Sequence, residues 1–251
     1  MSQQPGLSCR APGCAATVLC KAHIIPAGFA RGLSSPGGHN IALRPDRAKP
    51  ANQPLGAFDT AILCASCDRR LGVYDEYAIK FCGALPMTAS TPMGEIFRVA
   101  DFDGATFARA ALAILWRASI SARDEWADVS LGPYEARAGE VLLGEFLLGT
   151  LPEFEVVLMR YASSNHDARK FVYNPLRIDS GGLDAFIFGL GGFQIIAKID
   201  RQPMHALLRP FVINEATSLR AYCLPLESTA EFADMANIAA AEREREKDRR
   251  G

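Results

Sequence analysis

The stretch FDTAILCASCDRRLGVYDEYAIKFC, residues 58–82, decides how the chain begins its fold. Its first seven residues form a short apolar run, which favours a β-strand. Cys64 and Cys67 follow with two residues between them, and the run from Cys67 to Cys82 is typical of a helix. We therefore predict a strand, a turn that carries two thiols, and a helix, in that order.

A second cysteine pair lies near the N-terminus. Cys9 and Cys14 are separated by four residues, and a long insert separates them from Cys64 and Cys67. Two closely spaced pairs of this kind predict a tetrahedral Zn²⁺ site, because each pair folds as a knuckle that directs two thiolates at one ion. The alternative is that these cysteines are small buried apolar residues without a metal.

The remaining cysteines and the N-terminal residues indicate the compartment. Cys20 lies in an apolar, strand-like run, and Cys82 and Cys223 lack a close partner in the sequence, so we interpret all three as packed thiols. Seven cysteines is an odd number, and the first residues lack the basic and apolar segments of a secretion signal. We therefore expect a cytoplasmic protein with reduced thiols rather than a disulfide framework.

Composition divides the chain into two parts. Residues 15–25 predict a strand, residues 27–57 are rich in Gly, Pro and Arg and predict a long loop, and residues 85–94 are typical of a domain boundary. Residues 1–70 hold 8 basic and 3 acidic side chains, whereas the other 181 residues hold 19 basic and 25 acidic ones. We predict a basic N-terminal module over residues 1–90 and a second domain over residues 91–251.

The second part predicts an α+β domain. Residues 105–121 and 134–148 have the apolar pattern of helices, and the C-terminal end predicts a charged helix. Alternation with a period of two then predicts strands over residues 153–162, 170–178, 183–190, 192–200, 207–214 and 218–225. Two helices and a mainly antiparallel sheet follow, and this sheet is a candidate surface for a homo-oligomer. No run of eighteen apolar residues predicts a membrane span.

Several of these segments together resemble a known family. The Cys9–Cys14 pair, KAHIIP at 21–26, the stretch 56–78 and WRASIS at 116–121 resemble the HNH, or ββα-metal, endonucleases. The resemblance is to the zinc-stabilised treble-clef form in bacterial and phage proteins with a Ser-His-Ile-Ile-Pro type motif. It implies a treble clef over residues 1–90 and metal-dependent hydrolysis of phosphodiester bonds in nucleic acid.

The resemblance also implies roles for single residues. His23 stands at the position of the general base, Asp59 at that of the family's asparagine, and Asp68 at that of a metal-binding histidine. Carboxylates bind Mg²⁺ and Mn²⁺ well, so Asp68 is the predicted ligand of a catalytic divalent ion. Each residue also has a structural alternative: a core imidazole for His23, a solvated turn for Asp59, and a helix cap for Asp68.

One departure from the family pattern leaves a second function open. Ala22 stands where a metal-ligating side chain usually precedes the base. The alternative to a nuclease is therefore an inactive zinc module that binds nucleic acid or a protein partner. In either case DNA is the expected nucleic acid, and the predicted phosphate contacts are Arg31, Arg44, Arg47, Lys49, Arg69 and Arg70.

Overall fold

The computed structural model describes residues 7–31, 40–42, 51–53, 57–86, 91–144, 146–180 and 182–250. The α-helices in this part of the chain are α1 (Ala27–Arg31), α2 (Ala65–Ala84), α3 (Gly104–Ser119), α4 (Glu135–Leu143) and α5 (Ala230–Arg250). The strands are β1 (Ala22–His23), β2 (Asn40–Ala42), β3 (Ala51–Gln53), β4 (Phe58–Asp59), β5 (Ile96–Val99), β6 (Val156–Ala162), β7 (Tyr173–Ser180), β8 (Leu183–Leu190), β9 (Phe193–Lys198) and β10 (Leu219–Pro225).

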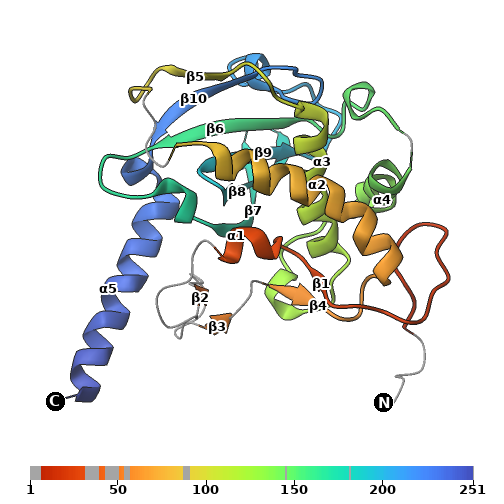
Figure 1. The fold of residues 1–251 in the computed structure, drawn as a ribbon, viewed down its shortest axis with the longest axis horizontal. Helices are drawn as coiled ribbons and strands as arrows, with labels where there is room; N and C mark the ends of the chain where they lie inside the picture. The colour runs from red at the N-terminus through yellow and green to blue at the C-terminus, as the bar shows by residue number, and fades with distance from the viewer. Residues whose placement is uncertain are drawn as a thin grey trace.

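The largest sheet has the order β5-β10-β6-β9-β8-β7. Its neighbouring strands are antiparallel except for β10 and β6, which run parallel. Helices α2 and α3 lie side by side across the middle of the molecule, and α5 projects from its body (Figure 1). The predicted α+β class with a mainly antiparallel sheet is confirmed.

Local interactions explain where several helices begin and end. The Asp103 side chain accepts the Thr106 backbone N–H at 2.9 Å and so caps the N-terminus of α3. Helix α2 ends at Ala84, just before Leu85 and Pro86, because the residue before a proline is disfavoured in helical conformation. The helix predicted over residues 134–148 ends earlier, at Leu143, where Gly144 leaves the helical conformation.

One predicted strand is absent from the structure, and one observed strand is absent from the prediction. The run 207–214 is not a strand: Arg209–Phe211 forms a 3₁₀ turn, and only Val212 makes an isolated bridge to β6. Pro210 explains this, because proline has no backbone N–H to donate to a sheet. In contrast, β5 was not predicted; it is a four-residue edge strand that pairs with β10.

The two strands predicted near the cysteines are much shorter than expected. β1 and β4 contain two residues each and pair with one another. The chain around them instead bonds across the cysteine region: Cys9 N–H donates to Ala16 at 2.8 Å, and Cys20 N–H donates to Leu63 at 2.9 Å. Within the predicted loop 27–57, α1 forms and β2 pairs with β3.

One hydrophobic core joins the two predicted domains. A single cluster of buried residues includes Ile24 and Leu63 of the N-terminal region, Phe107 of α3 and Phe193 of β9. The rings of Phe107 and Phe193 both pack against Phe81 of α2. The segments on either side of residue 90 therefore share one core.

Candidate metal centre

Four cysteines from the two predicted pairs meet in space. The sulfur atoms of Cys9, Cys14, Cys64 and Cys67 all lie within 4.8 Å of one another, and Cys14 Sγ is 3.8 Å from Cys64 Sγ. A tetrahedral Zn²⁺ site with Zn–S bonds of about 2.3 Å separates its sulfurs by about 3.8 Å. The four thiols are therefore positioned to bind a metal ion. Among the described residues, these four cysteines form the one group of His, Cys, Asp or Glu side chains that is placed to hold a metal ion.

A tight turn positions the first pair. The Cys14 N–H donates to the Ala11 carbonyl at 3.0 Å, with Pro12 and Gly13 between them. Gly13 has a φ of 72°, in the left-handed region. Proline followed by a left-handed glycine is the pattern of a type II turn, which brings Ala11 and Cys14 together and folds the chain back after Cys9.

The start of α2 positions the second pair. Cys64 is the N-cap residue of this helix, and Cys67 lies in its first turn. The Cys64 N–H donates to Cys9 Sγ at 3.3 Å, so the backbone of the second knuckle also contacts a thiol of the first. The helix that follows Cys64 thus orients both of its sulfurs toward the N-terminal turn.

The environment shifts the pKa values of Cys9, Cys64 and Cys67 in different directions. The backbone N–H of Cys67 donates to the Cys64 sulfur and lowers the pKa of Cys64 to about 7. Burial raises the pKa of Cys9 and of Cys67. One sulfur is therefore readily deprotonated near neutral pH, and a metal ion would displace the protons of the others on binding.

Strands β1 and β4 form an antiparallel pair although α1, β2 and β3 lie between them in the sequence, and we call this pair the β1–β4 hairpin. It separates two of the predicted catalytic residues. His23 is directly opposite Phe58, and Ala22 is directly opposite Asp59. Opposite residues in an antiparallel pair share a face, whereas successive residues alternate between faces. The half-buried His23 therefore shares its face with Phe58, at a ring separation of 6.1 Å, and Asp59 lies on the other face.

Asp59 is a buried structural contact rather than a solvated turn residue. Its side chain is 5% exposed. One carboxylate oxygen accepts the Ala61 N–H at 2.7 Å, and the other accepts the Ser121 hydroxyl at 2.6 Å. These bonds tie the hairpin to the segment after α3.

Asp68 lies in the first turn of α2 but does not cap the helix. The N-cap position belongs to Cys64, four residues earlier. Burial raises the pKa of Asp68, while the nearby guanidinium of Arg117 acts in the opposite direction. The charged side chains that act on Asp68 are thus Arg117 and Asp75, both between α2 and α3.

Only some of the predicted phosphate contacts lie within the described residues. Arg44, Arg47 and Lys49 lie outside the described residues, and so does the side chain of Arg31 at the end of α1. Arg69 and Arg70 are exposed residues of α2. The guanidinium of Arg70 donates to the Leu143 carbonyl, at the end of α4, so part of its hydrogen-bonding capacity is used within the fold.

The structure adds cations that the sequence did not predict. Lys21 Nζ lies 3.9 Å from the centre of the Phe58 ring, and the Arg123 guanidinium carbon lies 5.8 Å from it. Arg123 also donates to the Phe58 carbonyl at 3.0 Å. We call Lys21, His23, Phe58 and Arg123 the hairpin face. The alternation of Lys21 and His23 could have indicated part of it, but Arg123 is distant in the sequence.

The WRASIS run, residues 116–121, contacts the N-terminal region. Arg117 is 1% exposed and donates to both carboxylate oxygens of Asp75, at 2.7 and 2.9 Å. Ser121 of the same run bonds to Asp59. This run therefore joins α3 to both the hairpin and α2, which accounts for its polar residues inside an otherwise apolar helix region.

The site places the chain among proteins in which four cysteines at the start of a helix are positioned to bind a metal ion. No protein-family model matches the chain, and no curated protein or solved structure matches it either. The resemblance to the HNH endonucleases therefore remains a prediction from sequence motifs. Among the described residues, no helix is both long enough and apolar enough to cross a membrane.

Proposed function

We propose that residues 7–86 form a zinc-stabilised treble clef whose hairpin face binds nucleic acid. The observation that carries the proposal is the meeting of four sulfurs at the separation that a tetrahedral zinc ion requires. Soft thiolate ligands in a tetrahedral set favour Zn²⁺ over Mg²⁺ or Ca²⁺. Zinc would supply structural stability, and the nearby side chains would contact the ligand.

The order of the elements supports the treble-clef proposal. The Cys9–Cys14 turn comes first, the β1–β4 hairpin follows, and the Cys64–Cys67 turn leads directly into α2. The hairpin lies beside the lower part of α3, away from the large sheet (Figure 1). A single ion would therefore hold both knuckles to one end of α2.

The composition of the hairpin face supports nucleic-acid binding. Lys21 is exposed and lies over the Phe58 ring, so it can contact phosphate. Arg123, on the same ring, is 47% exposed and pairs with Glu125 at 3.3 Å, so its contact with phosphate would compete with that pair. Lysine and arginine contacts to phosphate supply most of the sequence-independent affinity for DNA. The excess of basic residues in the first 70 positions acts in the same direction.

Binding to duplex DNA is therefore expected to weaken as the salt concentration rises. Each phosphate contact that is formed displaces condensed counterions, so the affinity falls linearly on a double logarithmic plot. Lys21→Glu is expected to weaken binding about tenfold and to reduce the salt slope by about one. Fluorescence anisotropy with a labelled duplex at several salt concentrations measures both effects.

The control for this experiment is Arg220→Glu, an equal charge change at an exposed residue of β10. Its affinity should remain close to that of the wild type. An affinity that does not respond to salt, or an equal loss in both variants, would exclude the hairpin face as the contact surface.

A second candidate function is the HNH-type endonuclease. His23 supports it, because this imidazole lies on the same face as the two cations that would hold a phosphate. A neutral histidine can act as a general base near neutral pH. Asp59 does not assist this role from its observed position, since it bonds to Ser121 on the other face. In this candidate, the Mg²⁺ or Mn²⁺ ion and its ligand Asp68 remain predictions.

A nicking assay separates the two functions. We expect the zinc-loaded protein to bind supercoiled DNA in Mg²⁺ or Mn²⁺ without nicking it, because the carboxylate of Asp59 is engaged away from His23. Agarose gels report the conversion of supercoiled to open circular DNA. Nicking that is lost in His23→Ala but kept in His205→Ala, a variant of an exposed turn histidine, would establish the nuclease instead.

A further inference from the structure

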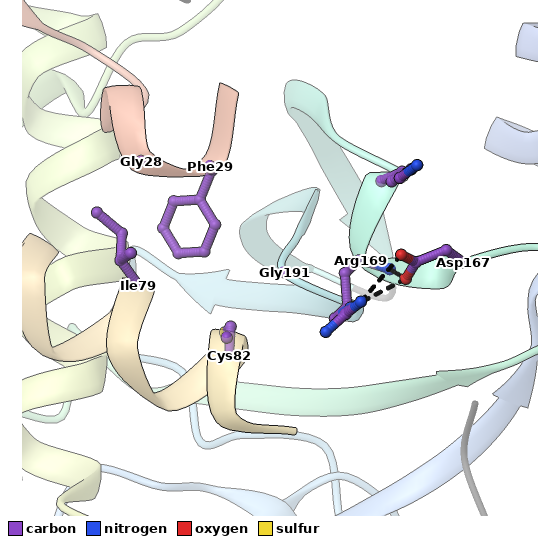
Figure 2. Close-up of a pocket in the computed structure, with 9 residues that line it drawn as sticks. Gly28, Phe29, Ile79, Cys82, Asp167, Arg169 and Gly191 are labelled. Carbon is purple, nitrogen blue, oxygen red and sulfur yellow. Dashed lines mark hydrogen bonds and ion pairs between the residues drawn. The ribbon is translucent and has the colours of Figure 1, made fainter. Parts of the chain in front are cut away.

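A cavity of about 300 Å³ has in its lining none of the four clustered cysteines and no residue of the hairpin face. One wall comes from Phe29 of α1 and from Ile79 and Cys82 of α2. The other comes from Asp167, Arg169 and Lys170, in and beside a 3₁₀ turn (Ala168–Lys170). Figure 2 shows the apolar side chains on one side of the space and the Arg169–Asp167 pair on the other.

A glycine turn between β8 and β9 closes the cavity between these walls. Gly191 has a φ of 58° and Gly192 a φ of 88°, both in the left-handed region. A Cβ atom on Gly191 would lie 2.5 Å from Cys82 Sγ and 3.0 Å from a ring carbon of Phe29. Only glycine therefore allows this turn to approach α1 and α2 so closely.

The cavity has an excess of positive charge. Arg169 donates to both carboxylate oxygens of Asp167, at 3.0 and 3.1 Å. Lys170 is exposed and has no ion pair within the described part of the chain. Burial raises the pKa of the Cys82 thiol to about 12, so this side chain adds no negative charge near neutral pH.

A third cation lies directly behind the glycine turn. Arg160 is 0% exposed, and its guanidinium donates to the carbonyls of Gly192 at 3.0 Å and Pro86 at 2.9 Å. Among the described residues, no carboxylate lies within ion-pair distance of it. A Cβ atom on Gly192 would contact both Arg160 and Arg169, so the two guanidinium-bearing side chains flank this residue. The residues that line the cavity thus carry two cations and one carboxylate, an excess of one positive charge, and the buried Arg160 adds a further positive charge behind the turn.

We propose that this cavity binds a small organic phosphate. A phosphate monoester carries a charge of about −1.5 to −2 at pH 7, which is opposite in sign to the excess of positive charge at the site. Lys170 and the unused N–H groups of Arg169 would contact the phosphate oxygens. The organic part would lie against Phe29 and Ile79, in a cavity at the lower end of the usual range for small-molecule sites. This proposal does not rest on the proposed nucleic-acid binding.

Calorimetric titration of the full-length, zinc-loaded protein tests the proposal with three probes. Adenosine 5′-monophosphate should bind at least tenfold more tightly than adenosine, which lacks the dianion. It should also bind at least tenfold more tightly than inorganic phosphate, which lacks the organic part. No binding of the nucleotide, or equal binding of adenosine, would overturn the proposal. Equal binding of inorganic phosphate would contradict the role of the apolar wall.

Two variants locate the binding to this cavity. Lys170→Glu reverses an exposed charge at the rim, and Gly83→Leu adds volume at a helix residue that lines the cavity. A Cβ atom at Gly83 meets no atom within 4 Å, so this variant should fold. Both should weaken nucleotide binding at least tenfold, whereas Arg201→Glu at a distant exposed position should not. Unchanged binding in both cavity variants would place the nucleotide elsewhere and overturn the proposal.

Discussion

Removal of the metal is expected to unfold the chain around the four cysteines, residues 7–23 and 57–68, whereas the rest of α2 stays packed in the shared core. Structural zinc contributes about 10–16 kcal/mol of apparent binding free energy near neutral pH, which is as large as the whole net stability of a typical domain. The strands between residues 7 and 86 contain only two or three residues each, too few to form a stable sheet on their own. Other backbone bonds in this part of the chain, such as Cys20 to Leu63, link segments that the four thiols bring into contact.

Hydrogen exchange before and after chelation measures this effect. Amides of residues 57–64 and of the first turn of α2 should lose their protection when the metal is removed. Metal analysis should find one zinc ion per chain, and Cys64→Ser should lose it. Protection that survives complete removal of the metal would show that the thiols are packed without a structural role.

Cys20→Ser is the matched control for Cys64→Ser. Cys20 is a half-buried thiol of the same region and does not belong to the four-sulfur cluster. Its variant should therefore keep the zinc ion and most of the stability. Equal loss of metal in both variants would mean that the ligand set has been assigned incorrectly.

Asp75→Ala is expected to lower the free energy of unfolding by about 3–5 kcal/mol. The variant leaves the Arg117 guanidinium, which is 1% exposed, without the carboxylate that accepts two of its hydrogen bonds. A buried charge has lost its hydration, and without its partner no ion pair compensates for that loss. The effect should spread beyond α2, because Arg117 belongs to the run that also holds Asp59.

Urea denaturation of two further variants tests this reason. Glu76→Ala removes an exposed partner of Lys80 on the same helix, and its effect should stay below about 0.5 kcal/mol. The double variant Asp75→Leu with Arg117→Met removes both charges and should recover most of the stability lost in Asp75→Ala. A double variant as unstable as the single one would show that shape, rather than charge, explains the loss.

Local pattern was sufficient for the metal ligands and most elements. Two cysteine pairs at short spacing identified the four thiols that the structure brings together, because a knuckle is formed by a few consecutive residues. Helices α2 and α3 and strand β8 followed from periodicity over their own length. The prediction of a strand over residues 207–214 was wrong, because the alternation of apolar residues does not reveal that Pro210 has no N–H to donate to a sheet.

Local sequence pattern was thus enough to predict the thiol set, the α+β class and the positions of most helices and strands. Tertiary structure alone decided that Asp59 bonds to Ser121, that Asp75 pairs with Arg117, and that Arg123 lies beside Phe58. It also decided that α1 and the β8–β9 turn enclose one cavity. Spacing and periodicity act through neighbours along the chain, whereas these contacts join residues from distant segments and depend on how whole elements pack.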